Sequence, residues 1–159
     1  MVNVSADIAA LFERDLRRLS QEIAAFPDDE LPWATLPGVS NSAGNLVLHL
    51  EGNLREYIGR QLGGIAYTRD RPAEFSRRGL SRVELKARVD SLRQIIPPVI
   101  FKMNEMSLEA PFPEVVHGRT LSARQYLLHL YGHFHYHLGQ IDYLRRVLTE
   151  GGAITFAQL

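Results

Sequence analysis

Cysteine is absent from the 159 residues, which excludes disulfides, thiolate metal sites, iron–sulfur clusters and a cysteine nucleophile. Net charge is absent too, because 18 basic side chains balance 18 acidic ones, and this argues against a protein built to hold nucleic acid. No run of about 18 apolar residues could cross a bilayer, and the first residues lack the basic-then-apolar order of a signal peptide. We therefore expect a cytoplasmic protein that binds neither nucleic acid nor membrane.

The composition is that of an ordinary globular chain. Apolar residues make up 45% and charged residues 23% of the sequence, which is typical of a folded domain and not of a disordered one. The sequence shows no internal repeat, no low-complexity tract and no shift in composition. Since a chain of this length usually forms one domain, we predict a single domain over residues 1–159.

Strand-like alternation is also missing, and four segments instead carry apolar residues three or four positions apart, as helices do. The predicted helices cover about residues 6–26, 40–62, 81–106 and 120–149. Ser5 is the expected N-cap of the first, Ser40 or Asn41 that of the second, and Ser81 with Glu84 forms a capping box for the third. Residues 65–80 and 111–118 are interpreted as irregular connections.

Pro97 and Pro98 lie inside the third predicted helix, where proline normally stops a helix. Yet an apolar stripe continues through them at alternating spacings of four and three: Leu85, Val89, Leu92, Ile96, Val99, Met103 and Met106. The stripe predicts one helix bent at the prolines, and a break near Ile96 is the alternative. Four amphipathic helices without strands predict an all-α protein, a four-helix bundle.

Six histidines stand out: His49, His117, His129, His133, His135 and His137. A helix turns about 100° per residue, so His133 and His137 lie one turn apart on the apolar stripe of the last helix, whereas His135 points to the opposite side. A buried polar group without a partner costs about 1–3 kcal/mol, and a shared divalent ion would satisfy both imidazoles. Hydrogen-bonded structural histidines are the alternative.

His49 lies at the edge of the apolar stripe of the second predicted helix, so a third imidazole also faces the bundle interior. Three imidazoles suit zinc, nickel, copper or iron and leave positions open for water or substrate, as in catalytic sites. We therefore predict a site for a divalent transition metal at His49, His133 and His137. The one Glu-x-x-His pair, Glu114 with His117, lies in a loop and has no twin, which argues against a ferritin-type two-metal site.

Several other residues are candidates for the surroundings of this site. Asn45 and Asn53, one turn either side of His49, are candidate hydrogen-bond partners of its ring. His129 is a candidate for the pocket wall, and Gln140 for a hydrogen bond to a ligand histidine or to metal-bound water. Trp33 and Tyr57, with Phe134 and Tyr136, could line a substrate pocket, although aromatic residues in bundles are more often core.

Two stretches resemble motifs of the DinB-like superfamily, in particular its uncharacterised DUF1572-like branch. The first is NSAGNLVLHLEGNL, from Asn41 to Leu54, and the second is HFHYHLGQI, from His133 to Ile141. The resemblance implies an up-down-down-up bundle, a homodimer, and one nickel or zinc ion held by His49, His133 and His137. Leu138 departs from the pattern, since relatives often carry a small polar or basic residue there.

Relatives in that superfamily include transferases and an isomerase that use low-molecular-weight thiols, and others labelled metal-dependent hydrolases. The resemblance implies first a metal-dependent transferase that acts on a small-molecule substrate with a thiol cosubstrate. Residues 55–93 hold ten basic and five acidic side chains, which could attract an anionic cosubstrate or simply form a solvated surface. Hydrolysis by metal-activated water is a second possibility, although neither Glu51 nor Glu56 is well placed as a base. A non-catalytic metal-binding dimer is the third.

Overall fold

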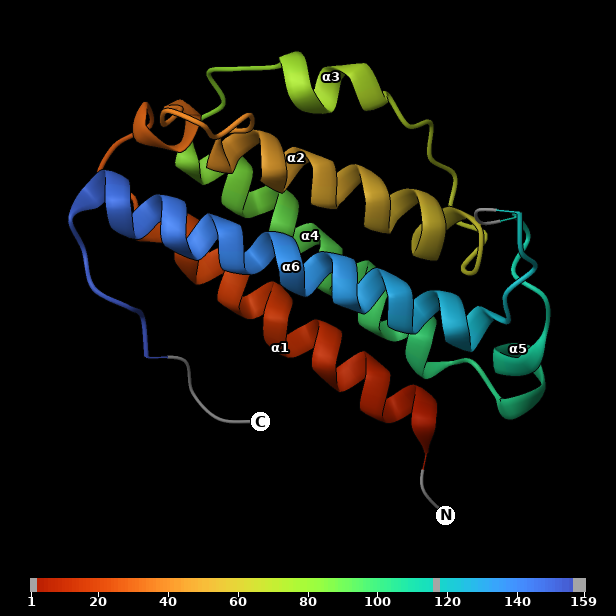
Figure 1. The fold of residues 1–159 in the computed structure, drawn as a ribbon. Helices are drawn as coiled ribbons and strands as arrows, with labels where there is room; N and C mark the ends of the chain where they lie inside the picture. Colours follow the sequence, from red (N-terminus) through yellow and green to blue (C-terminus); the bar gives the residue numbers. More distant parts are fainter. Residues whose placement is uncertain (1–2, 116–117, 156–159) are drawn as a thin grey trace.

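The computed structural model describes residues 3–115 and 118–155. Its long helices are α1 (Val4–Ala24), α2 (Ala43–Leu54) continued by the π-helical turn η2 (Arg55–Arg60), α4 (Arg82–Phe101) and α6 (Ala123–Thr149) (Figure 1). Three short helices occupy the connections: η1 (Leu31–Trp33), α3 (Arg71–Ser76) and α5 (Glu105–Glu109). The described residues contain no strand, so the predicted all-α class is confirmed.

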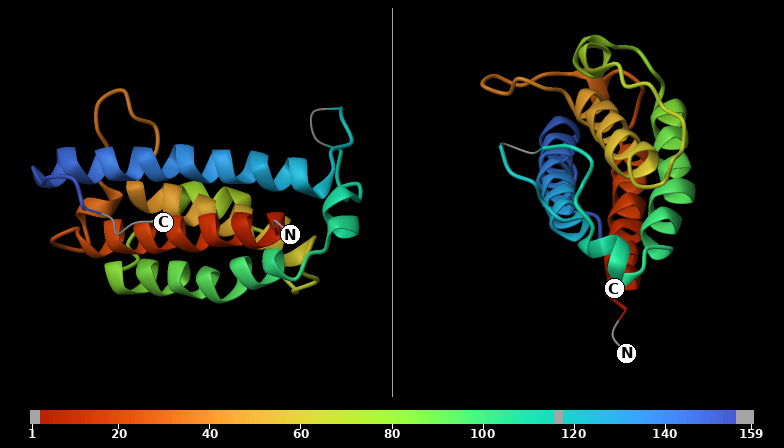
Figure 2. Two further views of the ribbon diagram at one scale, coloured as in Figure 1. Left: turned by 90° about the horizontal axis from the view of Figure 1, so that it is seen from below. Right: turned by 90° about the vertical axis from the view of Figure 1, so that its right-hand side faces the viewer.

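The four long helices pack in the predicted up-down-down-up order. Helices α1 and α6 run in one direction, and α2 and α4 run in the other (Figure 1). Parallel neighbours need a connection that travels back along the bundle, and the segment between α2 and α4 provides it. Figure 2 shows this segment, with α3 in it, passing over the outside of α2.

The core is apolar and continuous between the four long helices. Phe12 of α1, Leu50 of α2, Leu92 of α4 and Phe134 of α6 are each fully buried. Phe12 and Phe134 stack, with ring centroids 6.0 Å apart, so Phe134 is core and not pocket lining. No helix in the described part of the chain is long and apolar enough to span a membrane.

The N-caps of the first two helices differ from those predicted by one to two residues. Asn3, not Ser5, caps α1, since its side chain accepts a hydrogen bond from the Ala6 amide. Ser42, not Ser40 or Asn41, caps α2 in the same way. Several consecutive polar residues offered a cap in each case, and only the packing of the helix decides between them.

The third predicted helix passes through Pro97 and Pro98 without interruption, so the alternative of a break near Ile96 is wrong. The capping box of Ser81 and Glu84 is confirmed at its start. The apolar stripe does not reach Met106, however. Asn104 caps the separate helix α5, and Met106 on it is 80% exposed.

Candidate metal centre

Three histidines from two helices converge inside the bundle. The Nε2 atom of His133 lies 3.2 Å from Nε2 of His49 and 3.1 Å from Nε2 of His137. All three ring nitrogens lie within 4.8 Å of one another, an arrangement that could hold a metal ion. The residues that the sequence grouped are thus brought together, and α2 and α6 position them.

Partners on the outer side of two rings set which nitrogen carries the proton. Nδ1–H of His49 donates to Oε2 of Glu74 at 2.9 Å, and Nδ1–H of His137 donates to Oε1 of Gln140 at 2.7 Å. Because each Nδ1 holds the proton, each Nε2 presents a lone pair toward the centre of the cluster. Gln140 is therefore the partner of a ligand candidate, as predicted.

The third ring, His133, lacks such a partner. Its Nδ1 atom is buried and has no hydrogen-bond partner among the described residues. Burial, reinforced by the neighbouring His137 and His49, lowers the pKa of His133 to about 4. Burial also lowers the pKa of His137, although the hydrogen bond to Gln140 acts in the opposite direction. Both rings are neutral at pH 7, the state in which imidazole binds a metal.

The donor set fits a divalent transition metal. The Nε2 lone pairs of His49 and His137 both point at Nε2 of His133. A single proton on that nitrogen could form a hydrogen bond with only one of these two lone pairs. Zinc–nitrogen bonds are about 2.0–2.1 Å long, so tetrahedral ligand atoms lie about 3.3 Å apart. The two measured separations are close to that value. A cation at this point could coordinate all three nitrogens.

The carboxylate on His49 comes from the connection between α2 and α4. Asp70 caps α3, Pro72 occupies its first turn, and the buried Glu74 points from this helix toward α2. Arg69 binds both carboxylate oxygens of Glu74, at 2.6 and 2.9 Å. Burial alone would raise the pKa of Glu74, but the hydrogen bonds from His49 and Arg69 lower it below its ordinary value.

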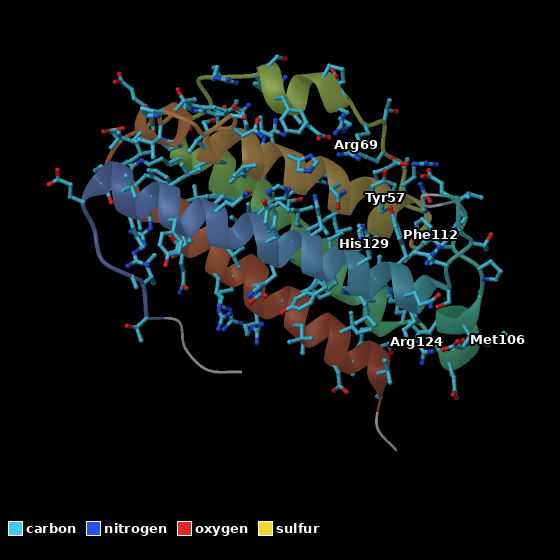
Figure 3. The ribbon with its side chains drawn as sticks, viewed as in Figure 1. Tyr57, Arg69, Met106, Phe112, Arg124 and His129 are labelled. Atoms are coloured by element: carbon cyan, nitrogen blue, oxygen red, sulfur yellow. The ribbon has the colours of Figure 1, made fainter. Side chains whose placement is uncertain are left out.

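A surface pocket of about 370 Å³ opens beside the histidines, and both His49 and His133 line it. Tyr57, Arg69 and His129 reach it from η2, from the segment before α3 and from α6 (Figure 3). Tyr57 lies in the π-helical turn, where the Gln61 amide bonds to the Glu56 carbonyl five residues back. Such turns are rare and frequently occur at functional sites.

The remaining predicted residues divide between this pocket and the body of the fold. Asn53, Tyr57 and His129 line the pocket. Asn45 does not, and neither asparagine is a partner of the His49 ring among the described residues, since Glu74 has that place. Trp33 is not a pocket residue either: its indole packs on Gly44 and donates to the Leu80 carbonyl.

Glu74 and Arg69 are functional candidates that the sequence reasoning missed. The Asp70-Arg71-Pro72 start of a helix was a usable signal, but a six-residue helix has too little periodicity to show which way Glu74 points. His135 lies away from the cluster, as predicted, and bonds to Asp15. His117 lies outside the described residues, so the Glu114–His117 pair is not placed.

The arginine-rich stretch from 55 to 93 is mostly neutralised within the fold. The basic side chains that form ion pairs with carboxylates are Arg55, Arg60, Arg69, Arg82, Lys86, Arg88 and Arg93. Glu51 pairs with Arg55 and Arg88 on the side away from the histidines, and Glu56 pairs with Arg60. Most of the positive charge in this stretch is therefore engaged in ion pairs within the protein and is not free to attract an anionic cosubstrate.

The fold and the cluster together define a helical-bundle protein with a candidate three-histidine metal site. Residues 5–157 match the model of a family described as "Protein of unknown function (DUF1572)". The chain belongs to this family. A comparison with curated proteins finds no match for it.

Proposed function

We propose that the chain binds one divalent transition-metal ion, nickel or zinc, through His49, His133 and His137, and that it is a metal-dependent transferase that uses a low-molecular-weight thiol. The observation that carries the proposal is the convergence of three imidazole nitrogens beside an open pocket. Two of these nitrogens have lone pairs directed inward by Glu74 and Gln140. Three protein ligands leave a coordination position for a substrate, as catalytic sites do.

A bound ion would act as a Lewis acid that lowers the pKa of a thiol or water beside it. The chain itself supplies no cysteine sulfur, so a thiol has to come from a cosubstrate. The resemblance of the two histidine motifs to the DinB-like superfamily, whose members include thiol-dependent transferases, supports this choice.

The pocket wall offers groups that would hold such a cosubstrate. Oδ1 of Asn53 is buried and has no partner among the described residues, so it can accept a hydrogen bond from a ligand. Arg71 brings a positive charge to the pocket and lies with its guanidinium 5.5 Å from the centre of the Phe75 ring. The rings of Tyr57 and Tyr126 pack edge to face with their centroids 5.4 Å apart, and they form the apolar part of the wall. A small anionic thiol fits these contacts.

Elemental analysis of the purified protein tests the metal site. We expect about one equivalent of a transition metal in the wild type, and its loss in His133→Ala and in His137→Ala. The metallated protein should then bind glutathione, bacillithiol or mycothiol in calorimetry. Metal content that survives both substitutions contradicts the site, and failure of all three thiols to bind contradicts the choice of cosubstrate.

Metal-assisted hydrolysis is the second candidate, and the position of His129 favours it. The nearby acids are engaged: Glu114, which lines the pocket, by Gln61, and Glu74, beside His49, by Arg69 and His49. His129 lines the same pocket as His133 and stacks on Tyr126 at 5.7 Å, so an imidazole could take a proton from water. Ester or amide turnover that His129→Ala abolishes while the metal is retained would favour hydrolysis over thiol transfer.

A further inference from the structure

We propose that Glu74 is the positioning residue of the candidate metal centre, and that it depends on the absence of a side chain at Gly52. This inference rests on the proposed metal site. It adds that part of the affinity for the metal comes from outside the two histidine-bearing helices, from the short helix α3 that lies over α2.

The carboxylate of Glu74 accepts three hydrogen bonds from two residues. His49 donates to one of its oxygens at 2.9 Å. Arg69 binds both oxygens, and the Glu74 and Arg69 side chains are only 6% and 12% exposed. A buried, ionised acceptor keeps the proton of His49 on Nδ1 and leaves Nε2 as the ligand atom. Carboxylate partners of this kind orient metal-binding histidines and raise their basicity.

Helix α3 is itself anchored so that Glu74 can reach the ring. Nδ2 of Asn45 donates to the carbonyls of Glu74 and Arg77, at 2.9 and 3.2 Å. These bonds tie the end of α3 to the first turn of α2, one turn before His49. Asn45 thus acts on His49 through the backbone of α3 and not by touching its ring.

Gly52 provides the space that the carboxylate occupies. A Cβ atom built on Gly52 would overlap Oε1 of Glu74 and lie 2.8 Å from its Cδ and 3.3 Å from Nε of Arg69. The atoms in the way belong to side chains, so an alanine would displace the carboxylate and leave the backbone in place. Gly52→Ala therefore removes the Glu74–His49 contact while every histidine and Glu74 itself remain.

Gly59 is the matched control on the same helical rod. A Cβ atom there would lie 3.7 Å from Ile95 Cγ2 and 3.9 Å from the Leu54 carbonyl, which is ordinary contact. Gly59→Ala makes the same chemical change in a buried position of the rod. It leaves Glu74 undisturbed.

The experiment measures zinc affinity by competition with a chelator in the wild type and in Gly52→Ala, Gly59→Ala, Glu74→Ala and Glu74→Gln. Loss of a partner of this kind typically costs 10- to 100-fold in metal affinity. We expect a loss of about this size for Gly52→Ala and Glu74→Ala, a smaller one for Glu74→Gln, which keeps an acceptor oxygen, and none for Gly59→Ala. Gly52→Ala should add nothing in the Glu74→Ala background, because both act through one contact.

Nitrogen-15 NMR of the metal-free protein gives an independent readout. The His49 ring should hold its proton on Nδ1 in the wild type and lose that preference in Gly52→Ala. Wild-type zinc affinity in Gly52→Ala and Glu74→Ala contradicts the inference, and so does an unchanged His49 tautomer. If His133→Ala and His137→Ala both retain the metal, the proposed metal site itself is wrong, so the two failures are distinguishable.

Discussion

Oε1 of Gln140 lies 2.7 Å from Nδ1 of His137, three residues earlier on the same helix. The amide oxygen can only accept a hydrogen bond, so Nδ1 carries the proton and Nε2 faces His133. This contact is the counterpart on α6 of the Glu74–His49 contact on α2. The two contacts differ because the acceptor on α6 is a neutral amide and lies on the same helix as its histidine, whereas Glu74 is a carboxylate on a different helix from His49.

Removal of this acceptor should weaken metal binding without unfolding the protein. We expect Gln140→Leu to lower zinc affinity by about 10- to 100-fold, the usual range for loss of a hydrogen bond to a ligand histidine. Chelator competition measures the change. Gln94→Leu, at an exposed position of α4, is the matched control and should bind zinc as the wild type does. Equal affinities of the two variants would contradict the role given to Gln140.

Asp15 ties α1 to α6 at a second buried cluster, on another face of α6 from the metal centre. Its side chain is fully buried and pairs with Arg14 and Arg18, and Tyr131 donates to it at 2.8 Å. Burial alone would raise the pKa of Asp15, but hydrogen bonds from Arg14, Tyr131 and His135 lower it below its ordinary value of 3.8. The same carboxylate, together with burial, raises the pKa of Tyr131 to about 12.

The free energy of unfolding should therefore decrease as the pH is lowered, and Asp15 should account for part of this decrease. A depressed folded-state pKa adds stability above about pH 4, and that contribution disappears as the pH falls below this value. Asp15→Asn should cost about 1–3 kcal/mol at pH 7, because a neutral amide cannot accept all the hydrogen bonds that Arg14, Tyr131 and His135 donate to the buried carboxylate, and it should flatten the acid limb of the stability curve. Urea unfolding between pH 3 and 7, with chelator present, gives both quantities. Wild-type and variant curves that stay parallel down to pH 3 would disprove this assignment.

The outward face of α6 is the surface on which we expect the chain to dimerise. From Leu128 to Val147 a stripe of exposed residues recurs every three or four positions and contains no charged side chain: Leu128, Gly132, Tyr136, Gly139, Tyr143 and Val147. The exposed Arg124 lies one turn before this stripe. This spacing is that of a helix–helix seam, and the open glycines leave room for the partner's tyrosines. A two-fold dimer through this stripe would place the same residues of both copies against one another.

Sedimentation equilibrium tests the expected homodimer. The wild type should have twice the mass of the 18.0 kDa chain, and Tyr143→Glu, which buries a charge in the seam, should shift it to monomer. Val83→Glu places the same charge on a side chain of α4 that is 77% exposed and should leave the dimer intact. A monomeric wild type at micromolar concentration would count against this surface.

The convergence of the histidines could be predicted because helix geometry links spacing to direction. His133 and His137 are four residues apart, and a polar pair on an apolar stripe needs a common partner whatever the rest of the fold does. The same geometry placed Gln140 beside His137 and turned His135 away. The continuity of α4 through Pro97 followed from an equally regular apolar stripe.

Contacts between distant segments could not be predicted in this way. Glu74 is 25 residues from His49, and its direction depends on how the connection between α2 and α4 folds back. The spacing in α2 makes Asn45 a candidate partner of the nearby His49 ring. Its amide group instead donates to the carbonyls of Glu74 and Arg77, and the sequence of α2 alone does not show that this segment lies beside it. Trp33 is a candidate for the pocket wall on the sequence alone, but it packs on Gly44, and a glycine gives no sequence signal that an aromatic ring lies against it.

The route from α2 to α4 is longer than the topology requires. The rod from Ala43 to Arg60 is about 27 Å long, a distance that an extended chain covers in about eight residues, and residues 65–81 are about twice as many. The surplus length forms α3. Homologues with a shorter return path could therefore keep the bundle and the histidine triplet yet lack the acidic partner of His49. Variation in this loop offers evolution a means of tuning the affinity of the proposed metal site while the bundle itself stays unchanged.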